Sequence, residues 1–328
     1  MGTVRRVALS TLLLAAVVAG TFVPSVSTAQ SYPSRPVRFI IPFPPGGPTD
    51  ILGRVVSTRL AEAWAVPVVA DNRPGAGGNI GTEQCARSPA DGYTVCMLSI
   101  AQTISPSIYP RLAFDPARDF AHVTLLATLP SLLVVHPSLP ARTVKELVVL
   151  AKARPGALSY ASGGAGTSTQ LLMEWLKLEA GVNIVHVPYK GSGPALVDQI
   201  SGQIEVAFTT IIAVLPYIQA GRLRAIAVST RERFPGLPAV PAVAESGVKD
   251  FDGGSWQGIV MPAGSPRDAV SKASLDLTKM LRSPDAREKI LAMGGITLGN
   301  SPEEFSVFVR TEMEKWAKVV KAAGIRPE

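Results

Sequence analysis

The 328-residue chain has few of the residues that carry catalytic and metal chemistry. Its three histidines, His122, His136 and His186, stand far apart without paired ligands, so a metal site is not expected. The sequence also lacks the G-x-x-x-x-G-K-[ST], G-x-S-x-G and H-E-x-x-H motifs of phosphate-binding loops, serine hydrolases and zinc proteases. We therefore expect neither a cofactor nor an enzymatic activity. The nearest motif, Gly75-Ala-Gly-Gly-Asn-Ile-Gly81, departs from the dinucleotide pattern G-x-G-x-x-G because Ile80 occupies the third glycine position.

Charge is also scarce and is not clustered. Charged residues make up 17% of the chain against 47% hydrophobic residues, which excludes an intrinsically disordered protein. Lys and Arg number 32 and Asp and Glu number 25, but no basic block and no interleaving of basic and aromatic residues is present. A nucleic-acid partner is therefore not expected. The small positive excess favours anionic solutes.

The chain lacks an apolar run long enough to cross a membrane. The N-terminal run, from Val7 to about Ala19, is short, follows two arginines and precedes Ser27-Thr28-Ala29, which resembles an A-x-A cleavage site. This order is typical of a secretory signal peptide over residues 1–29, so we expect the mature protein to be exported. The sequence has no cysteine near the cleavage point, so a lipid anchor is not indicated. The arginine pair leaves a twin-arginine signal open, although the flanking pattern is missing.

The chain has only two cysteines, Cys85 and Cys96. Cys85 is expected late in a helix and Cys96 in the next strand, so the two are potential neighbours. Because the chain is expected to be exported, a disulfide is one interpretation. Two small buried thiols are the other, and the residues alone leave both open.

Glycine (29) and proline (28) are abundant without a repeat, which indicates many tight turns between short elements. Strands and helices are expected to alternate over residues 35–98 and again over 158–228, which predicts two α/β units with mainly parallel sheets and helices on both faces. Extended apolar runs at 123–135 and 256–262 are expected to cross between the units. The expected first domain is residues 30–128 plus 252–328, and the second is residues 129–251.

Each unit contains one glycine-rich turn that follows a strand and opens a helix: Phe43-Pro-Pro-Gly-Gly-Pro-Thr-Asp50 and Ser162-Gly-Gly-Ala-Gly-Thr-Ser-Thr-Gln170. Free amides at a helix start bind anions, and glycine lets a ligand approach the backbone. Alternatively, the hydroxyl and acidic residues of these turns only cap their helices. The occurrence of two similar turns favours a shared anion site in a cleft between the units. His186 near the cleft is a contact residue or a packed one, and Tyr189 and Trp256 either line the cleft or lie in the core.

These segments resemble the Bug family, the periplasmic solute receptors of tripartite tricarboxylate transporters. The resemblance spans the mature chain and rests on Tyr32 to Asp50, Asn72 to Gly81, Asp91-Gly-Tyr93, Tyr160 to Gly164, His186 to Ser192 and Pro302-Glu-Glu-Phe305. It implies a type II-like periplasmic binding protein with two α/β domains, joined by two crossing strands, that closes on a small carboxylate. It also implies a monomer that delivers its ligand to a membrane permease. A sensor that presents the ligand to a signalling receptor is the alternative.

The resemblance implies a set of ligand-binding positions. They are Phe43, Pro45, Gly46, Gly47, Thr49 and Asp50 in the first turn, Ser162, Gly164, Gly166, Thr167 and Ser168 in the second, and more loosely Tyr189, Lys190 and Gly191, with Trp256 closing over the ligand. Two further positions depart from the family pattern. Gln170 stands where relatives often have histidine, and Thr209 where they often have aspartate. We therefore expect a ligand with one essential carboxylate and no required ammonium group.

Overall fold

The computed structural model describes residues 32–46, 48–164, 166–189, 192–292 and 294–325. The chain divides into a short unit, Met1–Ser34, and one compact unit, Arg35–Glu328, which contains both sheets described below. The predicted signal peptide, residues 1–29, lies outside the described residues. None of the described helices has both the length and the apolar sequence that crossing a membrane requires.

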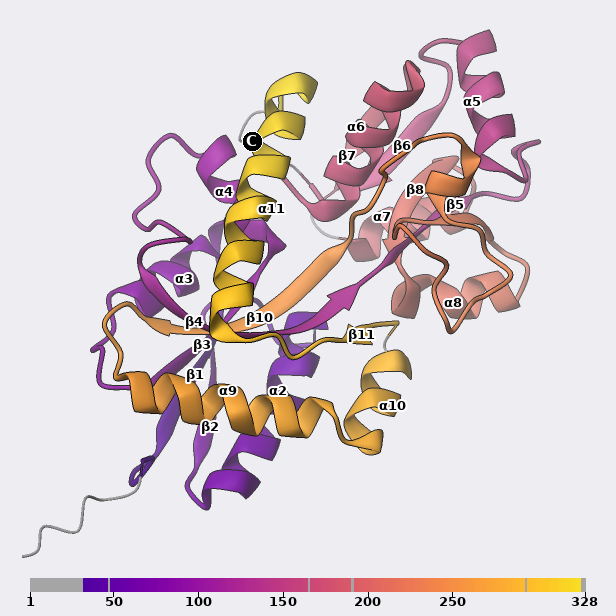
Figure 1. Ribbon diagram of the computed structural model, residues 1–328. Coiled ribbons are helices and arrows are strands. Elements are labelled where there is room, and N and C mark those ends of the chain that lie inside the picture. The colour runs from indigo at the N-terminus through magenta and orange to yellow at the C-terminus, as the bar shows by residue number, and fades with distance from the viewer. Residues whose placement is uncertain (1–31, 47, 165, 190–191, 293, 326–328) are drawn as a thin grey trace, which may run out of the picture. The chain divides into compact units, whose positions relative to one another are not determined.

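Six strands form the first sheet, in the order β11-β4-β10-β3-β1-β2 (Figure 1). They are β1 (Val37–Ile41), β2 (Val68–Asn72), β3 (Thr94–Ser99), β4 (Phe120–Leu129), β10 (Ser255–Pro262) and β11 (Ile296–Thr297). The helices of this part are α2 (Pro48–Trp64), α3 (Asn79–Ala86), α4 (Ile100–Ile108), α9 (Arg267–Leu281), α10 (Pro284–Ala292) and α11 (Pro302–Ala323), and η1 (Ala76–Gly78) is a single 3₁₀ turn before α3.

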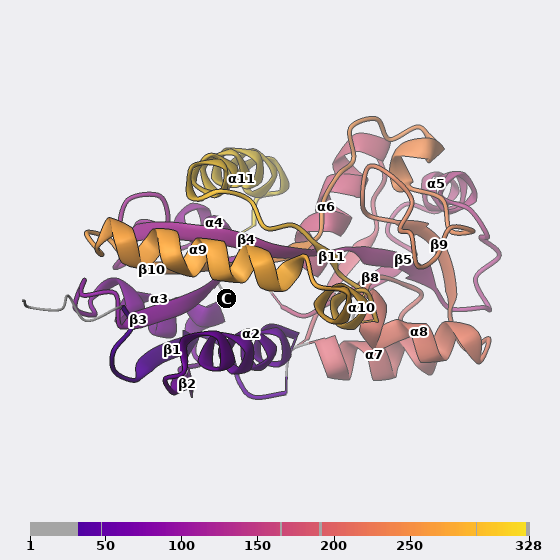
Figure 2. The ribbon, with the colours of Figure 1, turned by 60° about the horizontal axis from the view of Figure 1, so that its bottom comes forward.

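Five strands form the second sheet, in the order β7-β6-β8-β5-β9. They are β5 (Ser131–Val135), β6 (Ser159–Ser162), β7 (Val185–Pro188), β8 (Val206–Thr210) and β9 (Arg224–Val228). Figure 2 shows the helices on both faces of this sheet, with α7 and α8 on one side and α5 and α6 on the other. Their bounds are Val144–Ala153 (α5), Ser168–Ala180 (α6), Ser192–Ile200 (α7) and Ile211–Gln219 (α8), and η2 (Val243–Ser246) follows β9.

The α/β class with two sheets is confirmed, and the strand directions show how the sheets are joined. Strands linked by helices are parallel, as β1 is to β2 and β3, and β6 is to β7 and β8. The strands that pass between the sheets are antiparallel to their neighbours, as β10 is to β3 and β4, and β5 is to β8 and β9. The expected single crossing run at 123–135 is divided into β4 and β5 at Pro130, which has no N–H to donate to a ladder.

The ends of α11 follow from local sequence. The Ser301 hydroxyl accepts a hydrogen bond from the Glu304 amide at 3.2 Å, and the Glu304 carboxylate accepts one from the Ser301 amide at 2.9 Å. Pro302 fits the first helical position because its missing N–H has no intrahelical partner there. Gly324 ends the helix with a φ of 64°, a conformation that glycine adopts without strain. These local signals set both ends of the helix Pro302–Ala323.

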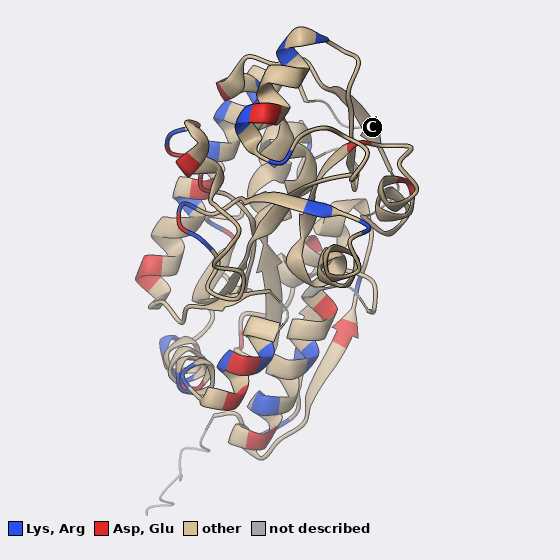
Figure 3. Ribbon diagram, turned by 90° about the vertical axis from the view of Figure 1, so that its right-hand side faces the viewer, with Lys and Arg blue, Asp and Glu red and all other residues tan. Residues whose placement is uncertain are grey.

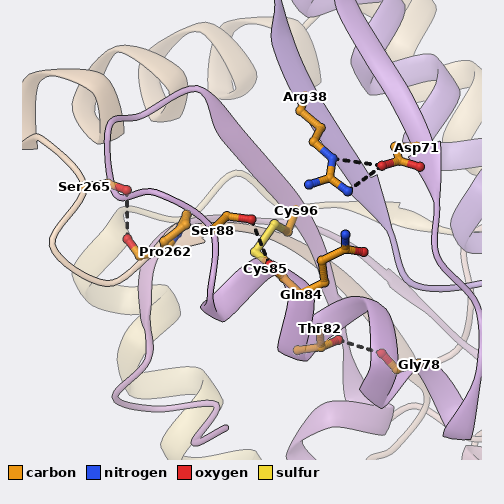
Figure 4. The surroundings of a disulfide bond; sticks show 10 residues. All are labelled: Arg38, Asp71, Gly78, Thr82, Gln84, Cys85, Ser88, Cys96, Pro262 and Ser265. Atoms are coloured by element: carbon orange, nitrogen blue, oxygen red, sulfur yellow. Dashed lines mark hydrogen bonds and ion pairs between the residues drawn. A yellow bond between two sulfur atoms is a disulfide. The ribbon is translucent and has the colours of Figure 1, made fainter. Parts of the chain in front are cut away.

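Cys85 and Cys96 form a disulfide between α3 and β3, which settles the question the sequence left open (Figure 4). Their Cα atoms are 6.4 Å apart, and both side chains are fully buried. The bond ties α3 to the sheet strand next to β1. A covalent link across 11 residues of sequence restricts the unfolded chain, so it stabilises the folded state relative to it.

We expect replacement of both cysteines with alanine to lower the free energy of unfolding by about 3 kcal/mol, the loop-closure value for a bridge of this span. Urea unfolding followed by circular dichroism measures this loss. A reducing agent should destabilise the wild type to a similar extent and leave the double variant unchanged. Equal sensitivity of both proteins to the reductant would contradict the prediction.

His122 is a buried titratable group in the first sheet. Burial is the main cause that lowers its pKa from 6.5 to about 4, and the Arg310 charge acts in the same direction. A ring nitrogen lies 3.2 Å from the Pro116 carbonyl oxygen, and the ring packs edge-on against Phe305 at 5.3 Å. The folded state therefore holds His122 in its neutral form.

This burial predicts a pH dependence of stability. Because the folded pKa lies below the unfolded value, the unfolded state binds more protons between these two pKa values. The contribution of His122 is complete above pH 6.5 and is lost as the pH falls towards 4, by about 3 kcal/mol in total. Urea unfolding at several pH values should show this extra slope in the wild type and not in His122→Gln. Parallel pH profiles of the two proteins would refute the assignment.

Candidate functional site

The first glycine-rich turn is organised by a buried carboxylate. The Asp50 side chain is 4% exposed, and its Oδ2 accepts hydrogen bonds from the Gly46 amide at 2.9 Å and from Arg54 Nε at 3.0 Å. Its Oδ1 accepts a third from Asn72 Nδ2 at 2.8 Å. Burial alone would raise the pKa of Asp50, but the hydrogen bonds from Arg54, Gly46 and Asn72 outweigh it and lower that pKa. Both oxygens of Asp50 are thus engaged in shaping the turn.

The segment Gly75 to Gly81 packs closely against this turn. A Cβ on Gly81 would lie 2.4 Å from the Arg73 carbonyl oxygen and 2.8 Å from Pro42 Cα. A Cβ on Gly78, whose φ is +96°, would lie 3.0 Å from the Phe43 ring. The glycines that resemble a dinucleotide motif therefore allow the start of α3 to pass closely against the first turn.

The second glycine-rich turn satisfies its own backbone. The Gly166 amide donates to Gln170 Oε1 at 2.8 Å, and the Thr167 hydroxyl donates to the Gly164 carbonyl at 2.7 Å. The Gly163 amide donates to Thr169 Oγ1 at 3.1 Å. A Cβ on Gly166 would lie 2.5 Å from Ile108 Cδ1, so this turn packs against the end of α4. In this turn the polar side chains therefore bind the backbone at the start of their own helix, which was the alternative to ligand binding.

His186 belongs to the inner side of the second turn. Its Nε2 lies 2.6 Å from Ser162 Oγ, its Nδ1 lies 3.3 Å from Gln170 Nε2, and its ring stacks on Tyr160 with centroids 4.8 Å apart. Ser162 is 1% exposed, and its hydroxyl also accepts the Gly164 amide at 3.1 Å. The serine–histidine contact therefore holds the turn and does not present a nucleophile to a substrate.

A cavity of about 330 Å³ brings together the N-terminal ends of three helices and the junction between β4 and β5. Gly46 and Ile51 come from the start of α2, Ser192 from the start of α7, and Thr210 to Ala213 from the start of α8. We refer to this cavity as the hollow. It is lined by Gly46, Ile51, Leu129, Pro130, Ser192, Thr210, Ile211, Ile212 and Ala213.

Helix N-termini carry partial positive charge and free amides, so their convergence suits an anion. Thr210 occupies the N-cap position of α8, but its side chain makes no hydrogen bond to the amides of that helix. None of the nine lining residues is charged, and among the described residues no three His, Cys, Asp or Glu side chains gather as a metal site would require. Figure 3 shows Lys, Arg, Asp and Glu interspersed along the helices. The hollow therefore offers dipoles and hydroxyls to an anion.

The predicted positions are distributed unevenly around the hollow. Gly46 lines it, and Thr49 and Asp50 are buried in the helix start beside it. Phe43, Pro45, Gly164, Gly166, Thr167, Ser168 and Gln170 are not among its lining residues. On the side of the second sheet, the starts of α7 and α8 line the hollow, and the turn at 162–170 does not. Gly47, Lys190 and Gly191 lie outside the described residues.

Four other predicted positions lie outside the lining of the hollow. Thr209 and Ser162 line a narrow cavity of about 10 Å³ that shares Ser192 with the hollow. The Tyr189 hydroxyl donates to Asp198 on α7 at 2.6 Å. Trp256 is 2% exposed and its indole N–H donates to Glu312 at 3.0 Å, so the core alternative describes it.

The residues of α8 were missed by sequence reasoning. Thr210 is the last residue of strand β8 and precedes an apolar helix, a pattern typical of an N-cap at a strand end. The apolar Ile211 and Ile212 nevertheless read as core residues. The helix α4 was missed as well, although Ser99 and Gln102 have capping-box spacing, and the Ser99 amide does donate to Gln102 Oε1 at 2.9 Å.

Two α/β sheets joined by crossing strands, with a hollow among helix N-termini, define a two-domain solute-binding protein. The sequence pattern of the tripartite tricarboxylate transporter family receptor matches residues 52–325, so the chain belongs to this family. The family is periplasmic and consists of receptors, not enzymes. This confirms the expectation that the chain has no enzymatic activity, and it confirms the resemblance to Bug proteins.

Individual proteins of this family are similar to the chain over most of their length. It is 35% identical to Protein BugT of Bordetella pertussis (strain Tohama I) over 91% of this chain and 92% of BugT. Rpa4515 of R. palustris, solved with adipate, is 36% identical with a TM-score of 0.82 over 90% of this chain and 100% of that one. MatC (Rpa3494) from Rhodopseudomonas palustris, solved with bound malate, is 28% identical with a TM-score of 0.77 over 88% and 100%.

Proposed function

We propose that this chain captures a small carboxylate in the hollow and delivers it to the membrane permease of a tripartite tricarboxylate transporter. The observation that carries the proposal is the convergence of the starts of α2, α7 and α8 on one cavity, whose lining among the described residues carries no charged side chain. Amides at the starts of α7 and α8 can hold an anion without a salt bridge, and the dipole of α2 adds positive potential. The adipate and malate in the structures of Rpa4515 and MatC support a carboxylate as the ligand.

The proposed cycle contains no covalent step. The protein is exported, its signal peptide is removed near Ala29, and it acts as a monomer in the periplasm. Residues 30–128 with 252–328 and residues 129–251 act as two domains. A carboxylate that makes better contacts when both domains enclose it shifts the population towards the closed form. Delivery then requires a permease that recognises this form.

Isothermal titration with carboxylates and with their neutral amides tests the binding step. We expect binding of at least one acid and no heat from its amide, because the helix dipoles favour the charged group. Equal binding of an acid and its amide would refute the carboxylate site. Deleting the gene and measuring solute uptake and gene induction separates transport from a sensory role, since a sensor would lose induction and keep uptake.

Asp50→Asn should weaken binding about tenfold, because the substitution removes the charge that holds the Gly46 amide and Arg54 in place, each a contact worth about 2 kcal/mol. Titration of the acid identified above measures the change. Asp71→Asn is the matched control, since Asp71 on β2 pairs with Arg38 and Arg73 away from the hollow. The control should lose stability and keep its affinity. Equal affinity losses in both variants would contradict a positioning role for Asp50.

A further inference from the structure

The lining of the hollow is apolar for an anion site. Six of its nine residues are aliphatic, namely Ile51, Leu129, Pro130, Ile211, Ile212 and Ala213. The remaining three, Gly46, Ser192 and Thr210, lie at the helix starts where an anion would sit. One end of a ligand therefore meets amides and hydroxyls, and the rest meets hydrocarbon.

Two isoleucines of this lining are left uncovered. Ile51 on α2 is 39% exposed and Ile212 on α8 is 38% exposed. They come from helices that flank different sheets, so the two side chains line the hollow from separate elements. An apolar ligand body that covers them removes hydrocarbon surface from water, which favours binding. A hydroxylated body would lose hydrogen bonds to water against these side chains without replacement.

We infer that the ligand is a carboxylate with a continuous hydrocarbon body, alkyl or aryl, and not a hydroxylated or amino acid. This inference rests on the proposed function and adds the ligand class. The carboxylate binds at the starts of α2, α7 and α8, and the hydrocarbon body lies against Ile51 and Ile212. A hydroxyl or ammonium group on that body has no charged partner among the nine lining residues. The volume of about 330 Å³ restricts the class to small acids.

A titration panel that varies charge and body independently tests both proposals. Hexanoate and benzoate carry a charge and a hydrocarbon body, hexanamide and benzamide carry only the body, and malate, citrate and glutamate carry charge on polar bodies. We expect hexanoate or benzoate to bind at least about tenfold more tightly than malate, citrate and glutamate, a difference typical of one or two buried methylene groups.

The outcomes separate the two proposals. Tighter binding of malate, citrate or glutamate overturns the hydrocarbon body and leaves the carboxylate site standing. Equal binding of hexanoate and hexanamide overturns the carboxylate site, while a preference for apolar bodies survives. Absence of binding across the whole panel overturns both.

Variants at the two isoleucines provide the second test. Ile51→Asn and Ile212→Asn should each reduce affinity for the hydrocarbon acid by about tenfold more than affinity for malate, because malate makes less apolar contact with these side chains. Val149→Asn is the matched control, because Val149 on α5 is 67% exposed and is not among the residues that line the hollow. The ratio of the two affinities is the readout, since general damage to the fold would lower both. An unchanged ratio in both isoleucine variants overturns the inference.

Discussion

Replacing Gly81 with alanine is expected to lower the free energy of unfolding by about 3 kcal/mol, the upper part of the range for overpacking. The added Cβ would meet the Arg73 carbonyl oxygen at 2.4 Å and Pro42 Cα at 2.8 Å. Both are backbone atoms, so no side-chain rotation relieves the clash. Because Pro42 directly precedes the first turn, the displacement should also weaken carboxylate binding. Urea unfolding and titration of the same variant measure the two effects.

Gly193→Ala is the control for this prediction. Gly193 lies in α7, and a Cβ there would have no heavy atom within 4 Å. The variant should be as stable as the wild type or slightly more stable, because alanine favours a helix over glycine. A Gly81→Ala protein with wild-type stability and affinity would show that the α3 start does not constrain the first turn.

Replacing Glu312 with leucine should cost about 4 kcal/mol, because it leaves two buried indole N–H groups without an acceptor. Glu312 on α11 is 5% exposed, and its Oε2 accepts from Trp256 at 3.0 Å and from Trp316 at 2.8 Å. Its Oε1 pairs with Lys315. Trp256 lies on β10, so this carboxylate fastens α11 to a strand that passes between the sheets. Thermal unfolding should show a decrease of about 6 °C in Tm.

Two further variants define what Glu312 contributes. Glu312→Gln keeps an acceptor oxygen for the indoles and should lose only about 1 to 2 kcal/mol, the value of the weakened bonds. Glu314→Leu places the same leucine at an exposed position of α11 and should change stability little. If the leucine variants at 312 and 314 were equally stable, the indole hydrogen bonds would contribute nothing.

Local sequence signals predicted the elements whose ends they encode. The helix α6, Ser168–Ala180, begins after the hydroxyl residue Thr167 and ends at Gly181, whose left-handed conformation favours glycine. The apolar run at 256–262 predicted β10. The directions in which strands pair were not predictable in this way. Several antiparallel neighbours of β5 and β10 lie more than 60 residues away along the chain, as Leu132 and Val228 do.

Of the positions predicted in the first turn, Gly46 lines the hollow, whereas no residue of α8 was among the predicted positions. Polar residues beside Gly46 suggested ligand contacts, but the role of Asp50 depends on Asn72, 22 residues away, which occupies its second oxygen. Gln170 likewise serves the turn because Gly166 and His186 lie beside it. Whether Ile212 faces a core or a cavity depends on the surrounding elements, which an apolar pattern alone does not specify.

The register of β10 on β4 makes Leu129 and Ser255 Cα partners in an antiparallel ladder. The stretch from 130 to 254 therefore leaves and re-enters the first sheet at positions about 5 Å apart. Such a stretch can be replaced as one block by the corresponding block of a relative without lengthening either junction. A chimaera of this kind would inherit the α7 and α8 ends of its donor while retaining the recipient's Asp50 turn. Such an exchange at two points would leave the six strands of the first sheet unchanged.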